Sequence, residues 1–136
     1  MKGKPNSKPP KLEFSKITPL QDYYDDGYGN RYSVAKLLDD AKDLQVFDCP
    51  LAALDLTGEI WQGSNIFHLA WHVKKCMMAD LDAPILLDWN GCIADGRHRV
   101  IKAIAMGKRT IKARRMTWRP APDSTENSSN EPNRAS

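Results

Sequence analysis

The chain has 136 residues, of which 41% are hydrophobic, and a formal net charge of +3. This length supports one hydrophobic core and hardly a second, so we expect a single domain. No stretch approaches the roughly 18 to 20 apolar residues of a membrane span. The basic N-terminus lacks the apolar region of a secretory signal, which predicts a cytoplasmic protein. Cys49, Cys76 and Cys92 lack Cys-x-x-Cys spacing, so we expect reduced, mostly buried thiols rather than disulfides or a zinc site.

The charges are distributed unevenly along the chain. Residues 97–119 contain nine basic residues and no acid, whereas residues 20–60 contain nine acids and only three bases. One end of the domain is therefore cationic. Such asymmetry favours a phosphate-rich partner that docks on one side.

The N-terminal segment predicts little regular structure. Residues 1–12 are rich in Lys, Pro and Asn, and they are typical of a disordered tail or a basic arm that adds affinity for nucleic acid. Residues 14–20 predict a short extended piece. Residues 23–32 predict a polar, aromatic loop, whose tyrosines either anchor the loop or stack on a base.

The next segment predicts the first helix. Apolar residues recur at helical spacing over 34–44, directly after Ser33, a favourable N-cap. Residues 46–56 alternate loosely and predict an extended segment or strand. A glycine-punctuated loop follows, in which Glu59 and Trp61 either face solvent or turn toward the motif described below.

A second amphipathic helix is predicted over 66–79. His68 and His72 lie four residues apart on its flank, a spacing that can share a metal ion. The segment lacks the Glu of His-Glu-x-x-His, and no third ligand lies nearby in the sequence. No metal site is therefore predicted, although His72 could border a pocket.

The C-terminal half predicts a strand, a tight turn and a helix. Residues 84–94 read as a hairpin with Asn90-Gly91 as a type I′ turn. A helix over 97–106 follows, and then a strand over 110–116. Together the elements predict a compact α+β domain with a small mixed sheet and about three helices.

The expected domain spans residues 13–118. We expect residues 119–136 to be a second disordered tail, because they are rich in Pro, Ser and Asn.

Residues 95–99, Asp-Gly-Arg-His-Arg, are the most informative stretch. Asp95 ends a strand and can cap the new helix, and Gly96 allows a ligand to approach the backbone. The free amides of the first turn carry partial positive charge, to which Arg97, His98 and Arg99 add. The sequence therefore predicts a phosphate site at Gly96, Arg97, His98 and Arg99.

The same stretch carries a family resemblance. Asp-Gly-Arg-His-Arg after an extended, Asn-Gly, extended hairpin resembles the signature of the ParB/sulfiredoxin-like superfamily. The flanks agree with it: Pro84-Ile-Leu-Leu before the motif, and Lys102 to Ile111 after it. The resemblance covers roughly residues 47–116. It implies a turn that cradles a nucleotide phosphate at a helix N-terminus.

Two branches of the superfamily fit less well. Sulfiredoxins carry a reactive Cys in the turn where this chain has Arg97, so reduction of sulfinic acid is not expected. The chromosome-partitioning members continue into a helix-turn-helix domain. The chain most resembles the small stand-alone ParB-like proteins of plasmids and prophages. That group is nucleotide-hydrolysing or DNA-cleaving.

The candidate site residues follow from this motif. A bound polyphosphate, ATP or CTP with or without Mg²⁺, would be neutralised by the arginines. Asp95, His98 and Glu59 are the candidates for proton transfer or metal contact. Six further basic residues are candidates for nucleic-acid contact: Lys102, Lys108, Arg109, Lys112, Arg114 and Arg115.

Two classes of function remain open. The protein either hydrolyses a nucleotide or cleaves a phosphodiester, or it is a non-catalytic nucleotide-binding or DNA-binding regulator or adaptor.

Overall fold

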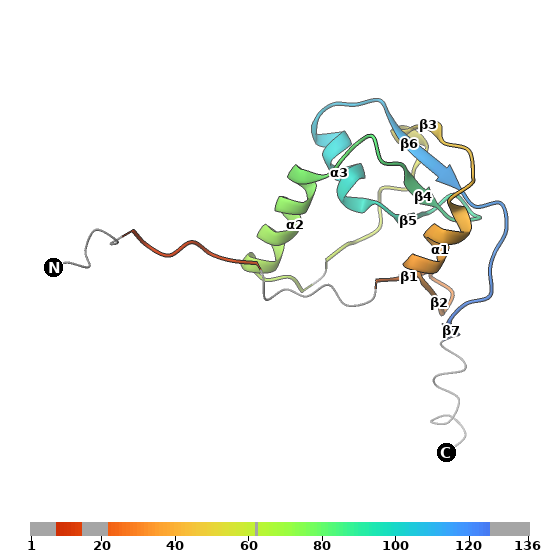
Figure 1. The fold of residues 1–136 in the computed structure, drawn as a ribbon, viewed down its shortest axis with the longest axis horizontal. Coiled ribbons are helices and arrows are strands. Elements are labelled where there is room, and N and C mark those ends of the chain that lie inside the picture. Colours follow the sequence, from red (N-terminus) through yellow and green to blue (C-terminus); the bar gives the residue numbers. More distant parts are fainter. Residues whose placement is uncertain (1–7, 15–21, 62, 126–136) are drawn as a thin grey trace, which may run out of the picture.

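In the computed structural model, residues 8–14, 22–61 and 63–125 are described, and they form an α+β domain with three α-helices and two small sheets (Figure 1). The predicted fold class is thus confirmed. In chain order the elements are β1 (Tyr23–Asp25), β2 (Asn30–Ser33), α1 (Val34–Ala41), β3 (Phe47–Pro50), α2 (Ile66–Met78), β4 (Ile85–Leu87), β5 (Ile93–Asp95), α3 (Arg97–Ala105), β6 (Thr110–Arg115) and β7 (Ser124–Thr125). Of the described helices, none is long and apolar enough to cross a membrane.

The larger sheet is mixed and has the strand order β3-β6-β4-β5. β4 pairs antiparallel with β5 and parallel with β6, and β6 pairs antiparallel with β3. Parallel strands need a crossover connection. β4 and β6 can pair in parallel because α3 returns the chain from β5 to the start of β6. β4 is central and all three of its residues are buried, which explains its uninterrupted apolar sequence.

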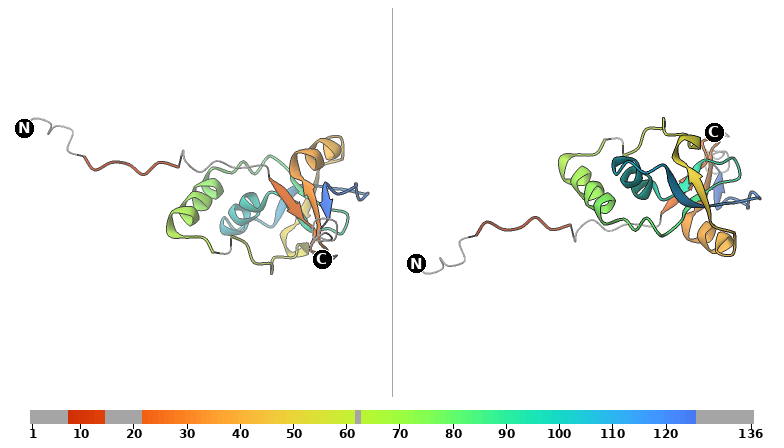
Figure 2. Two further views of the ribbon diagram at one scale, coloured as in Figure 1. Left: turned by 90° about the horizontal axis from the view of Figure 1, so that it is seen from below. Right: turned by 90° about the horizontal axis from the view of Figure 1, so that it is seen from above.

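Two hydrophobic cores lie on the two faces of this sheet. Ile85 and Leu87 face a core that includes Val100 and Ala103 of α3, whereas Leu86 faces a core built with α1 and β2. α2 packs against α3 on the side away from the sheet (Figure 2). α2 has only one buried residue, Cys76, so its other side chains are available to line a surface.

The smaller sheet corrects the expected loop over 23–32. These residues form the β1–β2 hairpin instead, which pairs with β7 in the order β1-β2-β7. Tyr24 and Tyr32 are 5% and 2% exposed, so neither is a free stacking surface. Tyr28 is 81% exposed.

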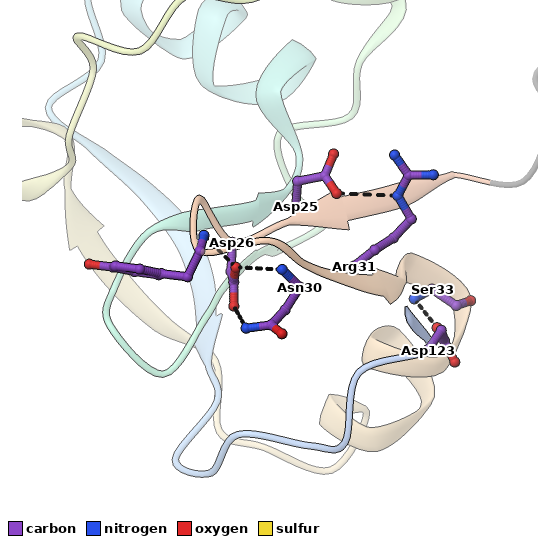
Figure 3. A network of polar contacts seen from close by, with 7 residues as sticks. Asp25, Asp26, Asn30, Arg31, Ser33 and Asp123 are labelled. Carbon is purple, nitrogen blue, oxygen red and sulfur yellow. Dashed lines mark hydrogen bonds and ion pairs between the residues drawn. The ribbon is translucent and has the colours of Figure 1, made fainter. Parts of the chain in front are cut away.

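The fold also continues past the expected boundary at residue 118. Asp123 accepts a hydrogen bond from the Ser33 amide (Figure 3). Asp123 also forms an ion pair with Lys36, and Arg119 donates to the Tyr32 hydroxyl. These contacts hold residues 119–125 on the domain although their composition suggests disorder. Expectations for 1–7, 15–20 and 126–136 lie outside the described residues.

The predicted hairpin over 84–94 is confirmed, but its turn is of another type. The Gly91 amide donates to the Asp88 carbonyl, and Gly91 has a φ of 85°. A type I′ turn would also require a positive φ at Asn90, which is absent. The side chain of Asp88, 1% exposed, accepts hydrogen bonds from the Asn90 and Cys92 amides and from the Tyr24 hydroxyl. This buried carboxylate therefore sets the turn and links the two sheets.

The helices begin where the sequence indicated. Ser33 and Asn65 cap α1 and α2 through hydrogen bonds to the amides of Lys36 and His68. α1 ends three residues before the predicted end of 44, whereas α2 and α3 end one residue early. Cys49 and Cys76 are buried and Cys92 is exposed.

Candidate functional site

The start of α3 is formed by a glycine in a left-handed conformation. Gly96 is the N-cap, with a φ of 109°, and no side chain caps the helix. Asp95 thus does not act as the predicted cap, because the helix begins after Gly96 rather than after Asp95. A Cβ at position 96 would lie 2.5 Å from Cγ2 of the buried Ile85. Glycine is therefore required here by the core, whatever approaches the outer side of the turn.

Asp95 and Arg99 form an ion pair across the first turn of α3. The Arg99 Nη2 donates to the Asp95 Oδ2 at 3.0 Å, and each side chain is 20% exposed. The Arg99 Nη1 donates to the carbonyl oxygens of Ala83 and Pro84. The guanidinium therefore links α3 to the residues just before β4, and Asp95 balances its charge.

A cavity of about 520 Å³ opens between α2 and the start of α3. This volume lies within the range of small-molecule sites. Its lining residues are Phe14, Trp71, Lys74, Lys75, Met78, Ala79, Asp95, Gly96, His98 and Arg99. We call it the basic cavity, because four of these side chains carry basic groups and one carries an acid.

The two lysines of the basic cavity lie beside aromatic rings. The Lys75 Nζ lies 5.1 Å from the centre of the Trp71 ring, and the Lys74 Nζ lies 5.3 Å from that of Phe14. No described acid forms a salt bridge with either lysine. Their charges are therefore available to an anion, next to an apolar wall.

His98 meets His72 of α2 at the wall of this cavity. The His72 Nδ1 and the His98 Nε2 are 3.0 Å apart, within hydrogen-bond distance. The indole of Trp61 lies parallel to His72, with ring centres 4.0 Å apart and an interplanar angle of 9°, and extends toward His98 at 5.2 Å. The loop before α2 thus covers both imidazoles.

Burial lowers the pKa of both imidazoles below the ordinary value. For His72 the nearby His68 and Lys75 add to the effect. For His98 the neighbouring His72 and Lys75 lower the pKa further, while Asp95 opposes them. Both rings are therefore neutral at pH 7, and one of them donates the shared hydrogen bond to the other.

Arg97 does not share the basic cavity with His98 and Arg99. It lines a second cavity of about 560 Å³, together with Ile101 and Ile104, the loop over 55–60 and the β1–β2 turn. Its guanidinium forms no hydrogen bond or ion pair with a described residue. The predicted phosphate set is therefore split between two cavities.

The second cavity contains four acids, so we call it the acidic cavity. They are Asp25, Asp26, Asp55 and Glu59. Three of them serve local structure. Asp25 pairs with Arg31, and Asp26 accepts from Asn30 and the Tyr28 amide (Figure 3). Asp55 accepts from Thr57. Glu59 lies here, and so the structure does not bring it to Asp95 and His98.

The six predicted nucleic-acid residues fall into two groups. Lys102 donates to the carbonyl oxygens of Met77 and Ala79 at the end of α2, and Arg114 donates to that of Leu44. These two cations are used within the fold. The four exposed cations are Lys108, Arg109, Lys112 and Arg115, of which Arg115 also donates to the Trp89 carbonyl and Lys112 lies 3.9 Å from Asp82.

Several residues of the basic cavity were not singled out from the sequence. Trp71 and Lys75 lie on the face of α2 opposite Ile66 and Val73, and Lys74 lies at the edge of that face, where such residues usually face solvent. The only sequence feature that indicated a pocket beside α2 was the position of His72 on the flank of this helix. Within the described residues, no group of three or more His, Cys, Asp or Glu side chains is arranged to hold a metal ion.

Comparisons with protein-family models, with curated proteins and with solved structures found no match.

Proposed function

We propose that this protein binds a nucleotide, ATP or CTP, through its phosphates in the basic cavity. The observation that carries the proposal is the uncapped start of α3 at Gly96, which opens into the same cavity as Lys74, Lys75 and His98. Helix N-termini favour anions, because their free amides and the helix dipole both present positive charge. The resemblance to the ParB/sulfiredoxin-like superfamily, in which this turn cradles a nucleotide phosphate, supports the same assignment.

The apolar wall of the cavity supports a nucleotide over a free phosphate. Trp71, Phe14 and Met78 line the cavity beside the lysines. An indole can stack on a base, which contributes roughly 1 to 3 kcal/mol. The phosphates would then lie at Gly96 and the base against Trp71.

Isothermal titration calorimetry with ATP, CTP and tripolyphosphate tests this proposal. The double variant Lys74→Ala/Lys75→Ala should lose most of the affinity for all three ligands, while Lys42→Ala, which removes an exposed lysine at the end of α1, should bind as the wild type does. Trp71→Leu should weaken ATP and CTP but not tripolyphosphate. An absence of binding by the wild type, or equal losses in the Lys42 variant and the double variant, would refute a dedicated phosphate site.

Catalysis is the second candidate, and the observation that favours it is the neutral His98 imidazole at the cavity wall. A neutral imidazole can accept a proton from an attacking water. In nucleotide hydrolysis the water oxygen would bond to the terminal phosphorus, the bond to the leaving phosphate oxygen would break, and His98 would take the water proton. Release of inorganic phosphate from ATP or CTP, with and without Mg²⁺, should then be lost in His98→Gln while binding remains.

Nucleic acid is the proposed macromolecular partner, bound at the four exposed cations Lys108, Arg109, Lys112 and Arg115. Contacts to phosphates alone give binding that weakens steeply with salt and varies little with sequence. Titrating a labelled duplex at two salt concentrations measures this directly. Lys108→Ala/Arg109→Ala should reduce affinity and flatten the salt dependence, whereas Lys102→Ala should change stability more than affinity.

A further inference from the structure

His72 and His98 lie side by side in nearly one plane. Their ring planes differ by 19°, and the ring centres are 5.2 Å apart, while the facing nitrogens are only 3.0 Å apart. Rings stacked face to face could not bring nitrogens this close without overlap of the rings. The nitrogens therefore point at each other in the ring plane, which is the geometry of a hydrogen-bonded imidazole pair.

Such a pair holds one proton between its two facing nitrogens. In the neutral pair one ring donates an N–H and the other accepts with its lone pair. Each ring has one further nitrogen, and no described residue is hydrogen-bonded to it. A single added proton can therefore enter at an outer nitrogen, and the central hydrogen bond then becomes charge-assisted. A second added proton would leave two donors facing each other at 3.0 Å.

The charged groups around the pair oppose protonation while the cavity lacks an anion. His68 and Lys75 of α2 and Arg99 of α3 all disfavour positive charge on the rings, and Lys74 lies in the same cavity. Asp95 of β5 is the acid that favours it, but Asp95 is paired with Arg99. A phosphate group in the cavity would reverse this balance, since it adds negative charge beside His98 and Lys75.

We propose that His72 and His98 act as one proton-sharing unit of the nucleotide site, which takes up a proton when a phosphate group enters the basic cavity. The inference rests on the proposed nucleotide binding and adds its regulation by pH. It stands in place of the catalytic candidate, because a protonated His98 cannot accept a proton from an attacking water. His98 contacts the phosphate, and His72 is a positioning residue that stabilises the protonated state of His98. Nucleotide affinity then rises as the pH falls, over the window between the pKa of the pair in the bound and in the free protein, by at most about tenfold per pH unit.

Trp61 is the second positioning residue of this unit. Its indole lies over His72 and extends over His98, so it excludes water from one face of the pair and attracts the added positive charge. Trp61 adopts a φ of 54°, a left-handed conformation that is unfavourable for a residue other than glycine. The stacking contact with His72 and a hydrogen bond from the Ser64 amide to the Trp61 carbonyl both involve this residue.

Proton uptake is measured by titrating ATP into the protein at pH 7 in two buffers that differ in their heat of ionisation. We expect the wild type to take up more protons per bound ATP than His72→Phe does. The difference should be a fraction of a proton that approaches one. Phe keeps the aromatic contact with Trp61 and removes the hydrogen bond. Lys42→Ala, a control at the end of α1 that changes a lysine outside both cavities, should resemble the wild type. Any proton that ATP itself releases on binding is released in the wild type and in the variants, so the difference between them reports the histidine pair.

Equal proton uptake in the wild type and in His72→Phe would overturn the inference while leaving the nucleotide site intact. Failure of the wild type to bind ATP would overturn both. If His72→Phe does not fold, His72→Gln serves in its place, because it keeps a polar side chain but cannot pass a proton between two nitrogens. Trp61→Phe should retain the pH dependence of affinity and Trp61→Leu should weaken it. A pH dependence unchanged in Trp61→Leu would contradict the role of the indole.

Discussion

The two cavities beside α3 differ in charge and in what their charged groups do. In the basic cavity Lys74 and Lys75 have no acidic partner among the described residues, and the start of α3 is uncapped. In the acidic cavity Asp25 forms an ion pair with Arg31 of the neighbouring strand, and the carboxylates of Asp26 and Asp55 accept hydrogen bonds within their own turns. A ligand therefore finds free charge in the basic cavity, whereas most charge in the acidic cavity maintains the fold.

The short motif over residues 95–99 contributes side chains to both cavities. Successive residues of an α-helix are rotated by about 100° around its axis. Arg97 therefore shares a side with Ile101 and Ile104, while His98 faces α2. Three adjacent basic residues in the sequence do not form one cluster in space.

The largest effect is expected for Gly96→Ala, because the new Cβ would meet Ile85 and the backbone would keep a positive φ. We expect a loss of about 2 to 4 kcal/mol in the free energy of unfolding. Gly107→Ala is the matched control, since Gly107 also has a positive φ but nothing lies within 4 Å of its Cβ position. Urea denaturation of both variants measures the difference, and equal losses would show that the contact with Ile85 is unimportant.

The next effect concerns the acidic cavity, which Tyr24 lines. Tyr24→Phe removes the 2.6 Å hydrogen bond to the buried Asp88, which keeps its two amide donors. Stability should fall by about 1.5 to 3 kcal/mol, the usual contribution of one hydrogen bond to a charged group. Nucleotide affinity should stay at the wild-type value. A Tyr24→Phe variant that folds but binds ATP poorly would show that the acidic cavity takes part in binding.

The next prediction concerns ATP affinity rather than stability, and it compares the loss caused by Lys75→Ala with the loss caused by Arg97→Ala. Lys75→Ala should weaken ATP by about 1 to 2 kcal/mol, or roughly 5- to 30-fold, because it removes a charge inside the basic cavity. Arg97→Ala removes a charge of the same sign from the acidic cavity, and it should cost less than about 0.5 kcal/mol through screened, long-range interaction. Calorimetry of the two variants under one salt condition is the measurement. The reverse order would assign the phosphates to the acidic cavity.

The smallest effect is the dependence of stability on pH. Burial depresses the pKa of His72 and His98 in the folded protein, so below their ordinary pKa of 6.5 the unfolded chain binds more protons than the folded chain. Their contribution to stability is therefore fully present above pH 6.5 and declines as the pH falls through the folded-state pKa. Denaturation at pH 7.5, 6.5 and 5.5 should show this loss, and it should be smaller in His72→Phe. An identical pH profile in that variant would exclude the pair as its source.

Local features of the fold were predictable from the sequence, and features that depend on distant partners were not. The three helices start at residues 34, 66 and 97, as predicted, because helix starts are set by residues within one turn, although Gly96 rather than Asp95 is the cap of α3. The β1–β2 hairpin was missed because burial of Tyr24 depends on Asp88, 64 residues away. The order of residues 119–125 likewise depends on contacts with β2 and α1.

The candidate site was predictable in part for the same reason. The glycine turn and the position of His98 follow from the motif itself. The divergence of Arg97 from His98 was also readable, because it follows from helical geometry alone. The pairing of His98 with His72 and their cover by Trp61 depend on how α2 and its preceding loop dock on α3, for which the spacing of the residues gives no signal.

Occupancy of the basic cavity by a nucleotide is tested most directly by mapping amide and indole chemical shifts during an ATP titration. We expect the largest shifts at the amides of Gly96 and His98 and at the indole N–H of Trp71. Residues of the acidic cavity, such as Ile60 and Ile104, should shift little. Largest shifts at Ile60 and Ile104, or saturating binding that leaves Gly96 and Trp71 unmoved, would contradict the account.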